Sequence, residues 1–318
     1  MRRNHKKSPP SDGVVEARVS EKGPRWPARR SNFLTSSACT CAWVLLCGPV
    51  ASAAEDFGKF GRGPIDVVGS VQRLVEETYT PHDPGRRLVF TRTFDPNGRV
   101  METQVALQDK AAPPQNRTRR AVVMRDEAGR VIEERVSDGS GGLTAKEVSR
   151  YDQHGHVVEQ VTYQPTGAES TKWLYAYDDR GRETDMRYYL AGVLRARYAY
   201  EHDERGNTIK TVAFRQDQSL EYTIVAKFDE KNRRTESLVY RPTGDVARRE
   251  TFHYGDQGYV TEHISYHPDG SVIEKQVLSY EFDQQGNWIK RTTSKQVVPA
   301  GKLESIEIAQ RTITYSAE

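Results

Sequence analysis

An Asp-x-x-Gly turn, usually preceded by an aromatic residue, recurs along this chain at a nearly constant interval. From Gly129 the turn residues fall at positions 155, 181, 206, 232, 258 and 286, so the intervals are 26, 26, 25, 26, 26 and 28 residues. A fixed period of this size indicates an array built by stacking one supersecondary unit. The residues expected to form the structural turns are Asp95, Gly98, Asp126, Gly129, Asp152, Gly155, Asp178, Gly181, Asp203, Gly206, Asp229, Asn232, Gly258, Asp283 and Gly286.

The segments between the turns alternate in character. Trp173, Tyr175 and Tyr177 share one strand face, whereas positions 172, 174 and 176 hold Lys, Leu and Ala. A period of two with many aromatic and β-branched residues predicts strands. A second series of turns, such as Pro-Thr-Gly at 242–244, halves each repeat, so consecutive strands should form hairpins. The predicted fold class is all-β: an antiparallel β-hairpin repeat array with a period of about 26 residues. We expect an extended, twisted meander sheet that can curl.

Composition limits how such an array is stabilised. Hydrophobic residues make up only 36% of the 318 residues, and the mean hydropathy is −0.76, which is too polar for a thick two-layer core. The 16 tyrosines and 9 phenylalanines nevertheless argue against disorder, because disordered chains are poor in aromatic residues. We therefore expect a thin, well-hydrated sheet in which each cross-strand aromatic pair adds roughly 0.2–1 kcal/mol.

The net charge of +3 belongs to the N-terminal part of the chain. Residues 1–53 contain nine Lys or Arg and three acidic residues, so residues 54–318 contain 38 basic and 41 acidic side chains. The body of the protein is slightly acidic and lacks the basic surface of a nucleic-acid-binding protein. No nucleic-acid partner is expected.

Residues 1–53 have the pattern of an export leader. Arg29 and Arg30 precede a short apolar run at 38–50, and Ala51 and Ala53 supply small residues at the expected signal-cleavage positions. The run is too short for a membrane-spanning helix, which needs about 20 residues. Sec export, twin-arginine export and an uncleaved amphipathic anchor stay open as alternatives. We divide the chain into this leader (1–53), a flexible segment (54–65) and one β-hairpin repeat domain (66–318).

All three cysteines, at positions 39, 41 and 47, fall in the leader. The mature chain is therefore expected to contain neither a disulfide nor a thiolate-bound metal. We expect an exported protein, periplasmic or extracellular in a bacterial envelope, that does not span the membrane after signal cleavage.

The repeated motifs resemble a known family. Tyr-Asp-x-x-Gly-Arg at 177–182, His-Asp-x-x-Gly-Asn at 202–207 and Phe-Asp-x-x-Gly-Asn-Trp at 282–288 are similar to YD repeats of the Rhs type. The resemblance covers residues 95–291. It implies strings of β-hairpins that spiral into a shell, in exported or cell-surface proteins with roles in toxin delivery, contact between cells and carbohydrate binding. This chain has too few repeats to enclose a cargo and no recognisable toxin domain, so it resembles a short exported member.

No group of residues has the pattern of a catalytic or metal-binding site. Seven histidines lie beyond residue 53, but no Asp or Glu position stands out beside them, so we expect no metal site. Acidic pairs such as Asp178-Asp179 fall at turns and are interpreted as solvated charges rather than the carboxyl pair of a glycosidase. The sequence contains no Gly-x-Ser-x-Gly or phosphate-binding motif. We expect neither catalytic residues nor a cofactor, and we interpret the protein as non-enzymatic.

One strand face is the candidate binding surface. It holds Trp173, Tyr175, Tyr177, Tyr198 and Tyr200 within two repeats. Exposed rings stack on sugars or anchor protein partners; the alternative is that these rings only pack against one another.

The predicted function is that of an exported repeat protein that provides a binding or scaffold surface in the cell envelope, with a glycan or a protein as partner. The alternative is a glycan- or metal-dependent envelope hydrolase with its site in the concavity of a curled sheet. A membrane-spanning barrel is excluded at this stage, because the sequence VIEERV at 131–136 puts charged residues on both strand faces.

Overall fold

The computed structural model describes residues 67–109, 118–296 and 302–316. All described residues belong to one compact unit. The predicted cleavage positions Ala51 and Ala53 and the segment 54–65 lie outside the described residues. Within the described ranges, no helix has the length and apolar character needed to cross a membrane.

The described residues form strands joined by turns and short connections, so the prediction of an all-β protein is confirmed. The strands are β1 (Val71–Thr80), β2 (Asp83–Phe94), β3 (Val100–Gln108), β4 (Thr118–Arg125), β5 (Val131–Asp138), β6 (Leu143–Tyr151), β7 (Val157–Tyr163), β8 (Glu169–Tyr177), β9 (Glu183–Leu190), β10 (Val193–His202), β11 (Thr208–Arg215), β12 (Leu220–Phe228), β13 (Arg234–Tyr240), β14 (Val246–Tyr254), β15 (Val260–Tyr266), β16 (Val272–Phe282), β17 (Trp288–Gln296) and β18 (Leu303–Tyr315).

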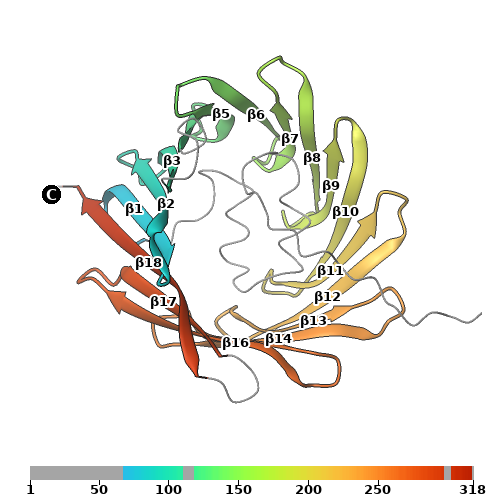
Figure 1. The fold of residues 1–318 in the computed structure, drawn as a ribbon. Helices are drawn as coiled ribbons and strands as arrows, with labels where there is room; N and C mark the ends of the chain where they lie inside the picture. Colours follow the sequence, from blue (N-terminus) through green and yellow to red (C-terminus); the bar gives the residue numbers. More distant parts are fainter. Residues whose placement is uncertain (1–66, 110–117, 297–301, 317–318) are drawn as a thin grey trace, which may run out of the picture. The chain divides into compact units, whose positions relative to one another are not determined.

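The strands form one closed antiparallel barrel (Figure 1). Each strand pairs with its neighbours in sequence, and β18 pairs back onto β1, with Leu74 opposite Ile313 and Tyr79 opposite Ile308. The prediction of an extended meander array is therefore wrong. A twisted sheet of 18 strands leaves two long edges of unpaired N–H and C=O groups when open, and closure pairs both edges.

Each Asp-x-x-Gly turn closes a hairpin with the same hydrogen bonds. Between β8 and β9, the Gly181 N–H donates to the Asp178 carbonyl and the Asp178 N–H donates to the Arg182 carbonyl, both at 2.9 Å. Asp178 Oδ1 accepts the N–H groups of Arg180 and Arg182, and Oδ2 accepts the Arg182 guanidinium. Gly181 has a φ of 76°, and Asn232 takes the same place with a φ of 60° because asparagine tolerates the left-handed region. The same turn bond is made at Asp95–Gly98, Asp126–Gly129, Asp152–Gly155, Asp203–Gly206, Asp229–Asn232, Gly255–Gly258 and Asp283–Gly286.

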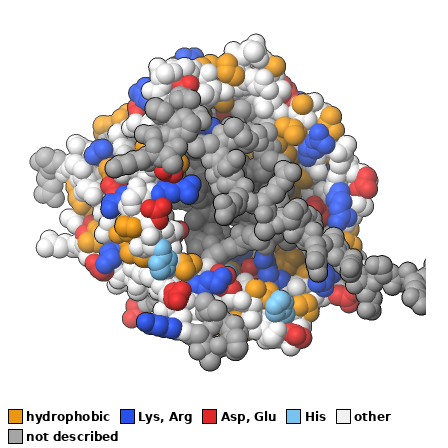
Figure 2. Space-filling view, viewed as in Figure 1, with side chains coloured by type: hydrophobic (Ala, Val, Ile, Leu, Met, Phe, Trp, Pro, Cys, Tyr) orange, Lys and Arg blue, Asp and Glu red, His pale blue; other side chains and the backbone are white. Residues whose placement is uncertain are grey.

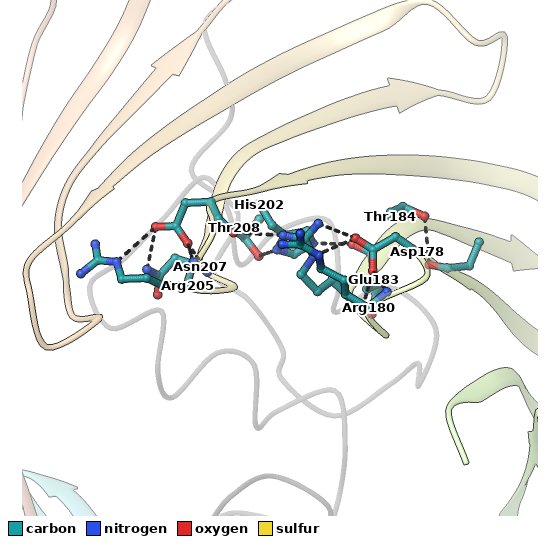
Figure 3. A network of polar contacts seen from close by, with 11 residues as sticks. Asp178, Arg180, Glu183, Thr184, His202, Arg205, Asn207 and Thr208 are labelled. Carbon is teal, nitrogen blue, oxygen red and sulfur yellow. Dashed lines mark hydrogen bonds and ion pairs between the residues drawn. The ribbon is translucent and has the colours of Figure 1, made fainter. Parts of the chain in front are cut away.

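An aromatic hydroxyl links each of several turns to the repeat before it. The Tyr177 hydroxyl donates to the Val157 carbonyl at 2.8 Å, 20 residues earlier, and the His156 ring stacks on Tyr177 with centroids 4.7 Å apart. His202 replaces tyrosine in the next repeat, with its Nε2 2.6 Å from the Glu183 carbonyl (Figure 3). The same 20-residue bond is made by Tyr151 to Val131, Tyr254 to Arg234 and Tyr280 to Val260. These bonds therefore join neighbouring repeats into a ladder.

The seam between β18 and β1 is held by the side chain of Asn287, which is fully buried. Its Oδ1 accepts the Val68 N–H at 2.5 Å, and its Nδ2 donates to the Val68 carbonyl at 2.8 Å and to the Tyr315 hydroxyl at 2.7 Å. The Tyr315 hydroxyl in turn donates to Asp283 at 2.5 Å. A hydrophobic cluster packs beside this network: Val71, Leu74, Phe94 and Val100, with Val67, Ile313 and Tyr315 against them. The seam is thus both polar and apolar in its contacts.

The two faces of the barrel differ in burial. The strand pairing places Leu74, Arg92, Thr103 and Ala121 in one row on the same face. We call this the inner face, because side chains converge on the concave side of a closed sheet and become more buried there. Its buried residues include Leu74, Thr103, Ala121, Glu134, Ser149, Gln160, Ala213, Ser237, Phe252, His263, Gln276, Leu278, Thr293 and Ala309. Less than ten percent of each of these residues is exposed although eight of the fourteen are polar, so the inner face is close-packed but not predominantly apolar.

Candidate binding surface

Aromatic residues gather on the inner face of β8, β9, β10 and β12. Strand pairing sets Trp173 opposite Tyr188, and the two rings stack with centroids 4.4 Å apart. We define the aromatic wall as Trp173, Tyr175, Met186, Tyr188, Tyr198, Tyr200 and Tyr222, which follow one another through the register of β8 to β12. Each of them is partly exposed. Part of the flat apolar surface of the wall is therefore left exposed after the rings have packed against one another.

Polar groups lie at the edge of the aromatic wall. The Tyr175 hydroxyl donates to Gln160 Oε1 at 2.7 Å, and the Gln160 side chain is itself buried. Burial raises the pKa of Tyr200, and the nearby Glu183 adds to the shift. Burial likewise raises the pKa of Tyr222, with Tyr198 as a second cause. These phenols therefore stay protonated and act as neutral hydrogen-bonding groups.

Four of the five residues predicted for the binding face lie together in this wall. Tyr177 shares the inner face but sits at the turn, where Val157 accepts its hydroxyl proton; burial raises its pKa to about 12. Sequence reasoning missed Met186, Tyr222 and Gln160. Each has the period-two spacing of an inner-face residue. The register between strands brings these residues beside Tyr175 and Tyr198, and spacing within one strand does not predict that register.

The inner face of β14 to β18 has a different character, because it is rich in ion pairs. Glu274 pairs with Lys295, and Arg291 pairs with Glu307 at 3.0 Å. His263 is 6% exposed and lies on Phe252, with ring centroids 4.7 Å apart, and burial lowers its pKa. This wall therefore presents charges and a neutral imidazole, in contrast to the aromatic wall.

Ion pairs also circle the outer face. We define the outer belt as the pairs Glu102–Arg120, Glu133–Arg135, Arg150–Glu159, Asp185 with Arg187 and Arg197, Lys210–Glu201, Glu236 with Lys227 and Arg249, Lys275–Glu262 and Lys290–Glu281. The basic side chains of these pairs all reach the solvent, from 32% exposed at Lys275 to 71% at Arg150. Charged side chains are spread around the periphery in Figure 2. Such exposed pairs contribute only about 0–1 kcal/mol each, so their significance is that this face is built for water.

The sequence predicts no metal ligand and no catalytic residue. Within the described ranges, no three His, Cys, Asp or Glu side chains are grouped so that they could hold a metal ion. A pocket of about 500 Å³ lies beside the seam, at the turn between β16 and β17. Its lining residues are Phe282, Asp283, Gln284, Gln285, Ile289, Ile313 and Tyr315.

No family model matches the sequence, and no curated protein matches it. A porin-like protein from Bacteroides uniformis is similar in structure, with 10% identity, 77% of this chain and 98% of that chain covered, and a TM-score of 0.46. A porin-like protein from Bacteroides vulgatus has 10% identity, 78% and 99% coverage, and a TM-score of 0.30. The TcdB2-TccC3 structure has 10% identity, a TM-score of 0.23, and coverage of 68% of this chain and 15% of that chain. The YD-repeat resemblance has no matching family model and stays a prediction.

Proposed function

We propose that this protein is an exported, non-enzymatic barrel of the bacterial cell envelope that binds a glycan on its aromatic wall. The observation that carries the proposal is the stacked pair Trp173–Tyr188 with hydroxyl and amide groups at its edge. A sugar ring presents C–H groups on its face and hydroxyls on its rim. Flat aromatic surface flanked by hydrogen-bonding groups is complementary to both.

The outer belt supports a barrel surrounded by water. A membrane-spanning barrel needs an outward apolar band about 25 Å tall, and each charge on its lipid face costs about 2–4 kcal/mol at the bilayer midplane. Here charged pairs recur on the outer face between β3 and β17, from Glu102–Arg120 to Lys290–Glu281. The proposal therefore makes the protein a component of the envelope outside the lipid bilayer.

The hydrolase alternative receives no comparable support. Hydrolysis of a glycoside uses two carboxyl groups about 5–9.5 Å apart, one of them held protonated or free to attack. On the inner face, Glu76, Glu274 and Glu307 are each paired with an arginine or lysine. Paired carboxylates are poor acids and poor nucleophiles, so we do not propose a hydrolytic role.

The proposal is tested by glycan binding of the exported form, on an array and then by calorimetry. The double variant Trp173→Ala/Tyr175→Ala should lose binding at least tenfold. The matched control is Tyr189→Ala, because Tyr189 belongs to β9 but pairs with Lys172 on the outer face. Circular dichroism establishes that each variant is folded. Unchanged glycan binding by the double variant, or equal loss in the control, would refute the aromatic wall as the binding surface.

A further inference from the structure

Three arginines lie close together on the inner face beside the seam, in a second sector of the wall. Arg311 on β18 lies over the Trp288 ring, with its Cζ 3.5 Å from the centroid, and Arg291 on β17 lies 5.4 Å from the same ring. Arg92 on β2 lies 5.7 Å from the Phe90 ring. We call Arg92, Arg291 and Arg311 the arginine cluster. In the 18-stranded ring it lies about half-way round from the aromatic wall (Figure 1).

The three arginines of the cluster differ in their ion pairs. Arg311 pairs with Glu76 at 2.8 Å, and Arg291 pairs with Glu307 at 3.0 Å. Among the described residues, no carboxylate forms an ion pair with Arg92. Burial lowers the pKa of the Arg311 guanidinium; Glu76 opposes this shift, and Arg291 and Arg92 add to it. Arg92 is therefore a cation without an ion-pair partner among the described residues, beside two arginines that each have a carboxylate partner.

Hydrogen-bonding capacity is also left over at this place. The Nε atoms of Arg92 and Arg291 are buried and have no hydrogen-bond partner. Thr103, which the strand pairing sets directly opposite Arg92, has a buried hydroxyl without a partner. Water would satisfy the Nε–H of an exposed arginine, but the Nε of Arg92 is buried and is not satisfied in this way. A buried donor without an acceptor costs about 1–3 kcal/mol, and more when it is charged.

We propose that the arginine cluster binds an oxyanion, a carboxylate or phosphate group carried by an acidic ligand. An oxyanion would pair with the Arg92 guanidinium and accept its N–H groups, and the planar guanidinium suits both a carboxylate and a phosphate. The aromatic rings of Phe90 and Trp288 hold the guanidiniums in place from one side. This site does not depend on the glycan proposal, because it uses other residues on other strands.

The test is thermal unfolding of the full chain with inorganic phosphate or sodium glucuronate, against sodium chloride at equal ionic strength. At a hundredfold excess over the Kd, a bound anion should raise the Tm by about 5–10 °C. A rise in Tm with phosphate alone identifies a phosphate site, and a rise with glucuronate alone identifies a carboxylate site. No shift above chloride for either anion would overturn the proposal.

Variants locate the effect. Arg92→Met should abolish the anion-dependent shift, whereas Arg92→Lys should keep part of it because the charge remains. Arg120→Met, which removes an outer-belt charge paired with Glu102, should keep the full shift. Should Arg92→Met fail to fold, Thr103→Val takes its place and should reduce the shift. An anion effect that survives both Arg92→Met and Thr103→Val would also refute the site.

Discussion

The seam offers the sharpest test of the barrel, through Asn287→Ala. This change removes three hydrogen bonds that the buried amide makes to the Val68 backbone and to the Tyr315 hydroxyl. Each bond contributes about 0.5–1.5 kcal/mol net, so the variant should lose about 3 kcal/mol of unfolding free energy. For a domain of this size, that loss corresponds to a fall in Tm of about 6–12 °C.

Asn207 provides the matched control, because it occupies the same place in its own turn. Its side chain donates to Asp203 and to Asn232, at 2.8 and 3.0 Å, on a partly exposed rim (Figure 3). Asn207→Ala should cost about 1 kcal/mol or less. Urea unfolding gives both values, and hydrogen exchange should show β1 and β18 losing protection first in Asn287→Ala. Equal costs for the two variants, or exchange spread evenly around the barrel, would contradict a seam held by Asn287.

Three further outcomes are expected. The Arg182 side chain and backbone lower the pKa of Asp178 to about 2. Its contribution to stability is therefore present above the unfolded pKa of about 3.9 and disappears as the pH falls towards 2. Asp178→Asn should lower the Tm at pH 7 and flatten its acid dependence, and parallel pH profiles would contradict this. Gly155→Ala should cost about 1–2 kcal/mol, because its φ is 87° although no atom crowds the site, whereas Asn232→Gly should stay within about 0.5 kcal/mol. Tyr254→Phe removes the bond to the Arg234 carbonyl and should lower the free energy of unfolding, measured with urea, by about 1 kcal/mol. An unchanged free energy would show that the ladder does not stabilise the barrel.

Local residues predict the strands but not the way in which they close. The period of two separates Trp173 and Tyr175 from Lys172, and the barrel sets these residues on opposite faces. At the seam, Asn287 bonds to Val68, 219 residues away along the chain, and to Tyr315, 28 residues away. In the sequence, Asn287 is indistinguishable from Asn207, since both follow an Asp-x-x-Gly turn.

The candidate site was predictable only in part for the same reason. Spacing within a strand puts Tyr198 and Tyr200 on one face, but the pairing between strands decides that Tyr222 joins them. The arginine cluster could not be found from the sequence. Arg291 and Arg311 lie on the consecutive strands β17 and β18, but Arg92 on β2 reaches them only because the barrel is closed.

Pairing of the first strand with the last makes assembly of the barrel a long-range event. Arg311 and Glu76, which face each other across the seam, are 235 residues apart in the chain. Hairpins form from contacts that are near in sequence and can appear early, but this last pairing must bring distant segments together and raises the contact order of the whole fold. Until then the chain is a curved ribbon with two unsatisfied borders, each a template for another molecule. The rate of seam closure, more than the strength of any repeat, should therefore set how much of the newly made protein escapes self-association.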